Sequence, residues 1–343
     1  MKELDILYQC DDNYVQYLVG SIASVLENNF GIGMIKVHIL DAGISLCSKD
    51  ILEGLVHRYS NSMIYFYETD KYRQICQQCG VPQWRGKYVA WYKLFAVDDL
   101  TDVMSDRILY MNPHCLVADS LDCVDDIDFH GKLWALTADP NVSETHKREL
   151  SMEANERYYN TGVMIINYDR WINGNFTARH ITNLTAEHDY PVVDQDYINA
   201  KLLDEVAYVG PEFCMVPMYW LNNIDAIYKT FRYTESNFHK KEDLRGAILH
   251  PRIIYGRPVT SSRRHQCFVD IWNHYLRVAG WTNTIRQTGG FDFRTFIRWG
   301  LPDWLALPLL KAYLNHITTV RRRPTEILEV TTVDSLNDDF GRK

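Results

Sequence analysis

The stretch Ile108-Leu109-Tyr110-Met111-Asn112-Pro113-His114-Cys115-Leu116-Val117 is the starting point for interpreting this chain. It begins as an apolar run typical of a buried strand, and two polar side chains then alternate around a proline. Residues i and i+2 of a strand point the same way, so Asn112 and His114 can converge on one ligand at the end of the strand. Open α/β sheets bind nucleotides just outside such strand ends. We therefore expect a ligand site here.

The rest of the chain predicts the sheet to which this strand belongs. Short apolar runs lie at 4–10, 35–40, 62–67, 107–111, 133–138 and 162–167, and helical patterns separate them. This alternation predicts a mainly parallel α/β sheet. The chain has 343 residues and 46% hydrophobic content, which is enough for one large α/β domain and an appended segment.

Six further segments follow one another along residues 4–260. They are Asp11–Tyr14, His38–Ser45, Leu116–Leu121, Tyr159–Gly162, Asp194–Asp196, and His250 followed by Gly256–Pro258. In this order they resemble glycosyltransferase family 8, the retaining nucleotide-sugar transferases. The resemblance implies a GT-A type, Rossmann-like mixed sheet flanked by helices over residues 1–260. It also implies a UDP-sugar donor and a product with the anomeric configuration of that donor.

The chain departs from the family at the metal site. The family places Asp-any-Asp where this chain has Asn112-Pro113-His114, and those two carboxylates hold Mn²⁺ or Mg²⁺ against the donor diphosphate. Asn offers a neutral oxygen, and His suits Mn²⁺ or a later transition metal better than Mg²⁺. His250 matches the third ligand of the family. Two alternatives follow: a weakened divalent-metal site of Asn112, His114 and His250, or capture of the diphosphate without metal by Lys93, Arg252 and Arg257.

The resemblance also assigns the residues that bind the nucleotide. Asp11 and Asn13 read uracil or ribose, and Tyr14 stacks on the base. Lys93 stands where the family usually has an arginine, and Gly256 and Arg257 lie near the position of a lysine that contacts the diphosphate. Asn112, Asn160 and Gly162 complete this set. Two structural alternatives remain: Asp12 or Asn13 caps a helix that begins near Tyr14, and Lys93 is an ordinary surface lysine.

A second group of polar residues belongs to the sugar side of the site. By resemblance, Gln195 lies beneath the anomeric carbon, and Asp194 or Asp196 holds sugar hydroxyls. Asp139 is the remaining carboxylate of this group. An internal-return mechanism needs no strong protein nucleophile, which agrees with an amide at the key position, whereas a two-step displacement would use Asp139 or Asp196. The acidic triplet also predicts the first turn of a helix.

Charged residues are distributed unevenly along the chain. Residues 250–323 contain twelve Lys or Arg against three Asp, a balance of +9, and the rest of the chain holds 24 against 41, or −17. Residues 261–323 are also rich in Trp, Phe and Leu, which predicts a helical segment that lies on an anionic membrane or packs on the catalytic domain. We expect residues 324–343 to form a disordered polar tail. No signal peptide or spanning segment is evident, so we expect a cytoplasmic protein, either free or attached to the inner face of the membrane.

These observations favour a retaining hexosyltransferase. We expect transfer of galactose or glucose from a UDP-sugar to a glycan or lipid-linked glycan, as in the synthesis of lipopolysaccharide, capsule or related glycans. The alternative is a degenerate family member that binds nucleotide or glycan and serves as a partner protein. Nucleic-acid binding is disfavoured, because the net charge is −8 and the basic end contains no recognised module.

Overall fold

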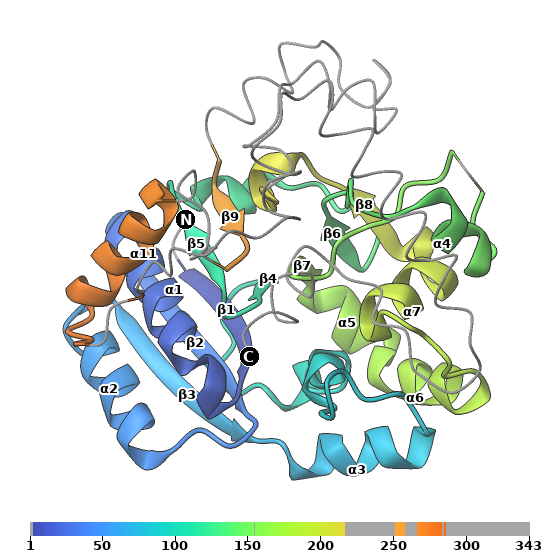
Figure 1. Cartoon of the computed structure of the whole chain (residues 1–343), viewed down its shortest axis with the longest axis horizontal. Helices are drawn as coiled ribbons and strands as arrows, with labels where there is room; N and C mark the ends of the chain where they lie inside the picture. The colour runs from blue at the N-terminus through green and yellow to red at the C-terminus, as the bar shows by residue number, and fades with distance from the viewer. Residues whose placement is uncertain (1–2, 154, 217–250, 258–265, 283–284, 286–343) are drawn as a thin grey trace.

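The computed structural model of the protein describes residues 3–153, 155–216, 251–257, 266–282 and 285. A seven-stranded sheet in the order β3-β2-β1-β4-β7-β6-β8 crosses the centre of the molecule (Figure 1). Its strands are β1 (Glu3–Cys10), β2 (Met34–Asp41), β3 (Ser62–Glu68), β4 (Arg107–Met111), β6 (Trp134–Leu136), β7 (Val163–Asn167) and β8 (Val206–Tyr208). A separate antiparallel pair joins β5 (Cys115–Val117) to β9 (Ile253–Tyr255).

The sheet is mixed but mainly parallel. Strands β3, β2, β1 and β4 run parallel to one another, and β6 runs parallel to β8. Only β7 is antiparallel to both of its neighbours, β4 and β6. All six predicted strands are confirmed, together with the predicted α/β fold class. Strands β5, β8 and β9, each three residues long, were not predicted, whereas the equally short β6 lies within the longer predicted run 133–138.

Helices cover both faces of the sheet (Figure 1). They are α1 (Val15–Asn28), α2 (Leu46–Val56), α3 (Asp70–Cys79), α4 (Glu144–Glu149), α5 (Tyr168–Gly174), α6 (Phe176–Ala186), α7 (Val193–Lys201) and α11 (Gln266–Val278). Alternate residues of β1 point to opposite faces of the sheet, and each face has its own hydrophobic core. Ile6 packs with α1 and α2 on one face, whereas Leu7 packs with α3, α6 and α7 on the other. A strand buried on both faces reads as a continuous apolar run, which is why β1 and β4 were evident in the sequence.

Helix α11 packs against α1, side by side with it in Figure 1. The Trp272 side chain is fully buried, and its ring passes so close to Gly20 that a Cβ there would lie 2.8 Å from two ring carbons. Asn28 of α1 donates a hydrogen bond to the hydroxyl of Tyr275 at 2.9 Å. This part of the predicted segment 261–323 therefore belongs to the core of the domain. The stretch 291–323 and the tail 324–343 lie outside the described residues.

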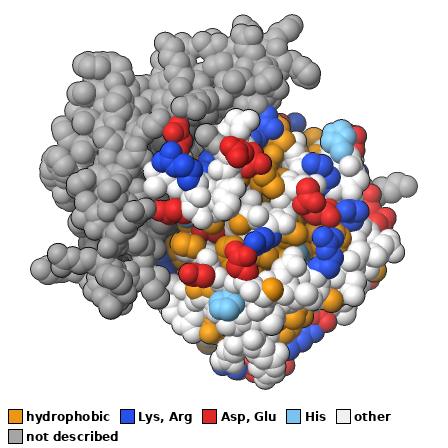
Figure 2. All heavy atoms as spheres, turned by 90° about the vertical axis from the view of Figure 1, so that its right-hand side faces the viewer, with side chains coloured by type: hydrophobic (Ala, Val, Ile, Leu, Met, Phe, Trp, Pro, Cys, Tyr) orange, Lys and Arg blue, Asp and Glu red, His pale blue; other side chains and the backbone are white. Residues whose placement is uncertain are grey.

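Two surface properties bear on possible partners. On the face shown in Figure 2, basic and acidic side chains are interspersed. A basic stripe or patch is what a nucleic acid requires, so this face does not suit one. Within the described ranges, the helices are too short or too polar for any of them to cross a lipid bilayer.

Candidate active site

The sheet brings three segments together at one edge. Because β1 and β4 are parallel neighbours, their carboxyl ends lie at the same edge of the sheet. Strand β7 runs antiparallel to β4, so its amino end lies there too. Asn112 directly follows β4, and Gly162 directly precedes β7. The backbone amide of Asn112 donates a hydrogen bond to the backbone carbonyl of Gly162 at 2.7 Å. The polar residues after β1 and β4 and before β7 thus share one edge. The sequence predicted this edge for the ends of β1 and β4, and only the resemblance placed Asn160 and Gly162 in the same site.

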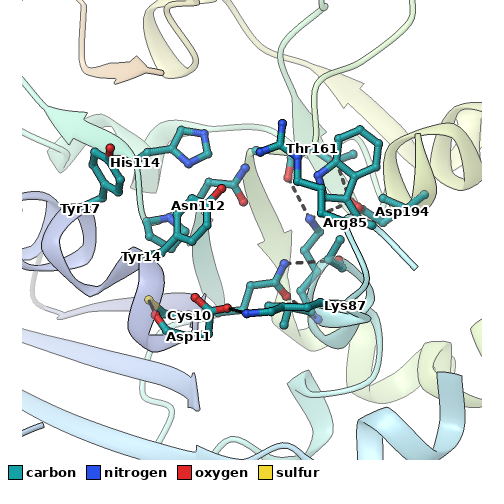
Figure 3. Close-up of a pocket in the computed structure, with 18 of the residues that line it drawn as sticks. Cys10, Asp11, Tyr14, Tyr17, Arg85, Lys87, Asn112, His114, Thr161 and Asp194 are labelled. Carbon is teal, nitrogen blue, oxygen red and sulfur yellow. Dashed lines mark hydrogen bonds and ion pairs between the residues drawn. The ribbon is translucent and has the colours of Figure 1, made fainter. Parts of the chain in front are cut away.

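A cavity of about 560 Å³ opens at this edge. Figure 3 shows Tyr14, Tyr17 and His114 on one side of it and Arg85, Thr161 and Asp194 on the other. Ten of the residues that the sequence singled out line it: Asp11, Asn13, Tyr14, Lys93, Asn112, His114, Gly162, Asp194, Gln195 and Arg257. The structure therefore gathers most of the predicted site around one pocket.

Six predicted residues are not in this lining, and the structure describes five of them. Asn160 and Asp139 lie behind it, where the Asn160 side-chain amide donates to Asp139 Oδ2 at 3.0 Å. Gly256 supports the wall through its backbone amide, which donates to the carbonyl of His114 at 3.3 Å. Asp196, in the first turn of α7, is fully buried. Arg252 donates to the carbonyl of Ser120, so its guanidinium is engaged away from the pocket. The sixth, His250, lies outside the described residues.

Lys93 and Asp194 form a buried ion pair in the wall of the pocket. The Lys93 ammonium lies 2.7 Å from Asp194 Oδ2, and the two side chains are 3% and 5% exposed. The same ammonium donates to the carbonyl of Thr161 at 3.2 Å and lies 4.4 Å from the ring centroid of Tyr110. Burial lowers the pKa of Lys93, and the charge of Asp194 opposes that shift. The alternative of a surface lysine is wrong, because the 3₁₀ helix Val89–Leu94 turns Lys93 inward.

Gln195 is held in a fixed orientation beside this pair. Its side-chain oxygen accepts from the Thr161 amide at 3.1 Å, and its side-chain amide donates to Asp139 Oδ2 at 3.4 Å. The Thr161 hydroxyl donates to Asp194 Oδ2 at 2.7 Å. The predicted helix start is confirmed, since Asp194 and Asp196 lie in the first turn of α7. The amide of Gln195 therefore faces the pocket in one defined position.

Asp196 serves the fold around α7. Its Oδ1 accepts from the Tyr158 hydroxyl at 2.6 Å and from His146 Nε2 at 2.7 Å, and its Oδ2 accepts from the Val192 amide at 2.6 Å. Burial acts to lower the pKa of His146, but the hydrogen bond and charge of Asp196 outweigh it, so the pKa is raised above its ordinary value. The oxygens of Asp196 are thus committed to α4, Tyr158 and the start of α7.

The loop after β1 differs in detail from the prediction. Asp11, rather than Asp12 or Asn13, caps the helical turn: its Oδ1 accepts from the Asn13 amide at 3.1 Å. The capping interpretation of Asp12 and Asn13 was wrong, because the turn begins one residue earlier than the pattern suggested. Asp12 instead accepts from the amide and hydroxyl of Ser45, each at 3.0 Å. The other oxygen of Asp11 pairs with Lys87.

The sequence prediction missed a hairpin that borders the pocket. Trp84 and Lys87 exchange backbone hydrogen bonds of 2.8 and 3.0 Å, and both residues between them have positive φ: Arg85 at 51° and Gly86 at 76°. Two such residues make a tight turn of the mirror-image type. Trp84, Arg85 and Lys87 all line the pocket. The sequence signal that could have indicated this hairpin was a single glycine flanked by an aromatic residue and two basic residues.

The metal ligands predicted after β4 do not fit a hard divalent cation. The Asn112 side-chain oxygen accepts from the Tyr110 hydroxyl at 2.7 Å, and its NH₂ donates to the Tyr255 hydroxyl at 3.4 Å. The His114 ring packs against Tyr14 and Tyr255. Mn²⁺ and Mg²⁺ prefer several oxygen ligands with negative charge. Across the described ranges, no three His, Cys, Asp or Glu side chains gather in a way that could hold a metal ion.

Comparison with known proteins gives one consistent result. The sequence model of the family described as Glycosyl transferase family 8 matches residues 5–244. General stress protein A of Bacillus subtilis is 24% identical over 82% of this chain and 96% of its own length. Lipopolysaccharide 1,2-glucosyltransferase of Escherichia coli is 25% identical over 59% of each chain. The crystal structure of the galactosyltransferase LgtC in complex with donor and acceptor sugar analogues superposes with a TM-score of 0.60 and 21% identity. It covers 83% of this chain and 98% of its own.

Proposed function

Because the chain belongs to glycosyl transferase family 8, we propose that it transfers galactose or glucose from a UDP-sugar to a glycan or lipid-linked glycan acceptor, keeping the anomeric configuration of the donor. One observation carries this proposal. The cavity at the carboxyl ends of β1 and β4 combines residues suited to a nucleotide with the fixed group Lys93, Asp194 and Gln195. The names of the Escherichia coli and Salmonella typhimurium relatives, lipopolysaccharide glucosyl- and galactosyltransferases, support a hexose as the group transferred.

The nucleotide is assigned to the side of the pocket formed by the loop after β1. Asp11 and Asn13 supply a carboxylate and an amide for the polar edges of uracil and ribose, and Tyr14 supplies a ring for stacking. Tyr14 is partly buried, and its ring contacts those of Tyr17 and His114. A base stacked here would place its diphosphate toward Asn112, at the centre of the pocket in Figure 3.

The donor sugar is assigned to the opposite wall. Asp194 accepts sugar hydroxyls, and Lys93 holds its carboxylate in place. Gln195 lies beneath the anomeric carbon with its amide fixed by Thr161 and Asp139. Positive charge in the pocket stabilises the leaving diphosphate as the glycosidic bond breaks. Donor groups aimed at that developing charge are the main contribution of the protein to the rate.

Retention through internal return is favoured over a two-step displacement. In internal return, the acceptor hydroxyl attacks from the face that the diphosphate leaves, and a diphosphate oxygen takes its proton. A two-step route requires a carboxylate within reach of the anomeric carbon. Asp139 and Asp196 lie outside the pocket lining, and their oxygens accept hydrogen bonds from neighbouring residues. This engagement supports the route that needs no protein nucleophile.

The proposals for the acceptor and for a membrane contact rest on the composition of the chain and on its relatives. The basic, aromatic stretch 291–323 supports attachment to an anionic bilayer, where a lipid-linked glycan would be found. Sedimentation with vesicles tests this point. Full-length protein should pellet with vesicles that contain an anionic lipid, and a chain ending at residue 290 should remain in the supernatant while still binding UDP. Full-length protein that ignores the anionic lipid would refute the attachment.

A catalytically inactive nucleotide- or glycan-binding protein is the second candidate. The replacement of the family's two metal-binding carboxylates by Asn112 and His114 favours it. Turnover separates the two candidates. Purified protein is incubated with UDP-galactose or UDP-glucose, and released UDP is measured. We expect release from one donor, and we expect Gln195→Ala to lower turnover more than UDP affinity. Gln78→Ala, an exposed glutamine on α3, is the matched control. UDP binding without release from either donor would favour the inactive candidate.

A further inference from the structure

The wall of the pocket is positively charged. Among the described residues that line it, Arg85, Lys87, Lys93 and Arg257 are cationic, and Asp11 and Asp194 are anionic. The Lys, Arg and Asp side chains of the lining thus give four positive charges against two negative, or +2. A cavity with this balance attracts an anion and repels a divalent cation.

The two carboxylates of the wall are already compensated. Asp194 pairs with Lys93 at 2.7 Å, and Asp11 pairs with Lys87. A divalent cation that approached either carboxylate would have to displace an ammonium group. The other two cationic residues of the lining, Arg85 and Arg257, carry guanidinium groups.

One of these guanidinium groups lies beside Tyr14, on the side of the pocket that carries His114. The Arg257 guanidinium carbon is 5.6 Å from the ring centroid of Tyr14, and the Tyr14 and His114 rings are 6.4 Å apart. The backbone amide of Gly256, the preceding residue, donates to the carbonyl of His114. Arg257 is thus tied to the same short segment as the residues that replaced the two aspartates.

The second guanidinium reaches the pocket from the hairpin Trp84–Lys87. The turn gives Arg85 a positive φ of 51°, and the guanidinium carbon lies 5.9 Å from the centroid of the Trp84 ring. In Figure 3, Arg85 lies on the far side of Asn112 from His114. A ligand centred on Asn112 would therefore have one arginine toward each side.

We propose that Arg257 and Arg85 bind the donor diphosphate in place of a divalent cation, so that this chain binds its donor without metal. Arginine presents a planar fork of donors that matches phosphate oxygens and stays charged at every physiological pH. The Asn112 side chain, which adds no negative charge, allows the diphosphate to pass between them. This inference rests on the proposed function, because it takes the donor to be a nucleotide diphosphate sugar.

Calorimetric titration of the full-length protein tests the inference. UDP, uridine and inorganic pyrophosphate are titrated in EDTA and in excess Mn²⁺, against the wild type and the variants Arg257→Gln, Arg85→Gln and Arg257→Lys. We expect UDP and pyrophosphate to bind in EDTA, and Mn²⁺ to change UDP affinity by less than about threefold. Each glutamine variant should weaken UDP about ten- to a hundredfold, the worth of one charge-assisted hydrogen bond, and leave uridine unchanged. Arg257→Lys should be intermediate.

Two further variants sharpen the result. Arg73→Gln removes an exposed arginine that pairs with Asp70 on α3, and it should leave UDP affinity unchanged. Asn112→Asp keeps the shape of the side chain and lowers the net charge of the wall from +2 to +1, so it should weaken the binding of UDP in EDTA. A metal site predicts the reverse for Asn112→Asp, namely tighter UDP binding in Mn²⁺ and no loss in EDTA.

The outcomes separate this inference from the proposed function. UDP that binds only with Mn²⁺ would overturn metal-free binding and leave the transferase proposal intact. Pyrophosphate binding in EDTA without any binding of UDP or uridine would support the anion site and overturn UDP as the donor nucleotide. Failure of all three ligands in both conditions would overturn both proposals.

Discussion

Replacing Lys93 by methionine should destabilise the protein far more than the same change at Lys87. Each lysine pairs with a pocket aspartate, but the Lys93 side chain is 3% exposed and that of Lys87 is 48% exposed. Lys93→Met leaves the buried carboxylate of Asp194 without its partner, which costs about 3–5 kcal/mol. Lys87→Met breaks a pair that water screens, worth about 0–1 kcal/mol. The two variants thus compare one chemical change at two depths.

Thermal unfolding followed by circular dichroism measures the difference. One kcal/mol corresponds to about 2–4 °C for a domain of this size, so Lys93→Met should lower Tm by roughly 6–20 °C and Lys87→Met by at most about 4 °C. Adding Asp194→Asn to Lys93→Met removes the orphaned charge and should recover part of the loss. Equal losses for the two lysine variants would refute the reasoning, and so would a double variant as unstable as the sum of the single ones.

The remaining predictions concern packing and pH. Gly20→Ala places a methyl group 2.8 Å from the buried Trp272 ring, so it should cost about 1–3 kcal/mol in urea unfolding, and an unchanged midpoint would contradict the packing of α11 on α1. Gly162→Ala would overlap the Tyr255 ring at the pocket edge, so UDP affinity should fall more than stability does, and a variant with wild-type affinity would count against this wall. The raised pKa of His146 means that its charge stabilises the fold fully below about pH 6.5, and that this contribution is lost as pH rises through the raised value. The unfolding free energies of wild type and His146→Gln should therefore converge as pH rises above about 6.5, and a constant difference would show that the imidazole acts without its charge.

The sequence predicted the central sheet well for a physical reason. Strands β1, β2 and β4 are covered on both faces, so most of their residues are apolar and each strand is visible as a run. Strands β5 and β9 were missed because they pair only with each other, across a large separation in sequence. Periodicity reports local structure, and no local signal marks such a pairing.

The site shows the same division between local and distant information. The polar residues at the ends of β1 and β4 were predicted because parallel neighbours must bring their ends to one edge. The burial of Lys93 was not predicted, since it depends on an ion pair with Asp194, which lies about a hundred residues further along the chain. Asp196 resembles its neighbour in sequence but turns toward His146, and only the packing of α4 against α7 reveals this.

The most direct test of the account is the configuration of the first product. Full-length protein is incubated with UDP-galactose or UDP-glucose and a glycan acceptor, and the anomeric proton of the new glycoside is followed by NMR from the first minutes. The account predicts an α-linked product from the α-linked donor, with free UDP formed in equal amount. A β-linked product would contradict retention, and donors that remain intact while UDP itself binds would contradict glycosyl transfer by this pocket.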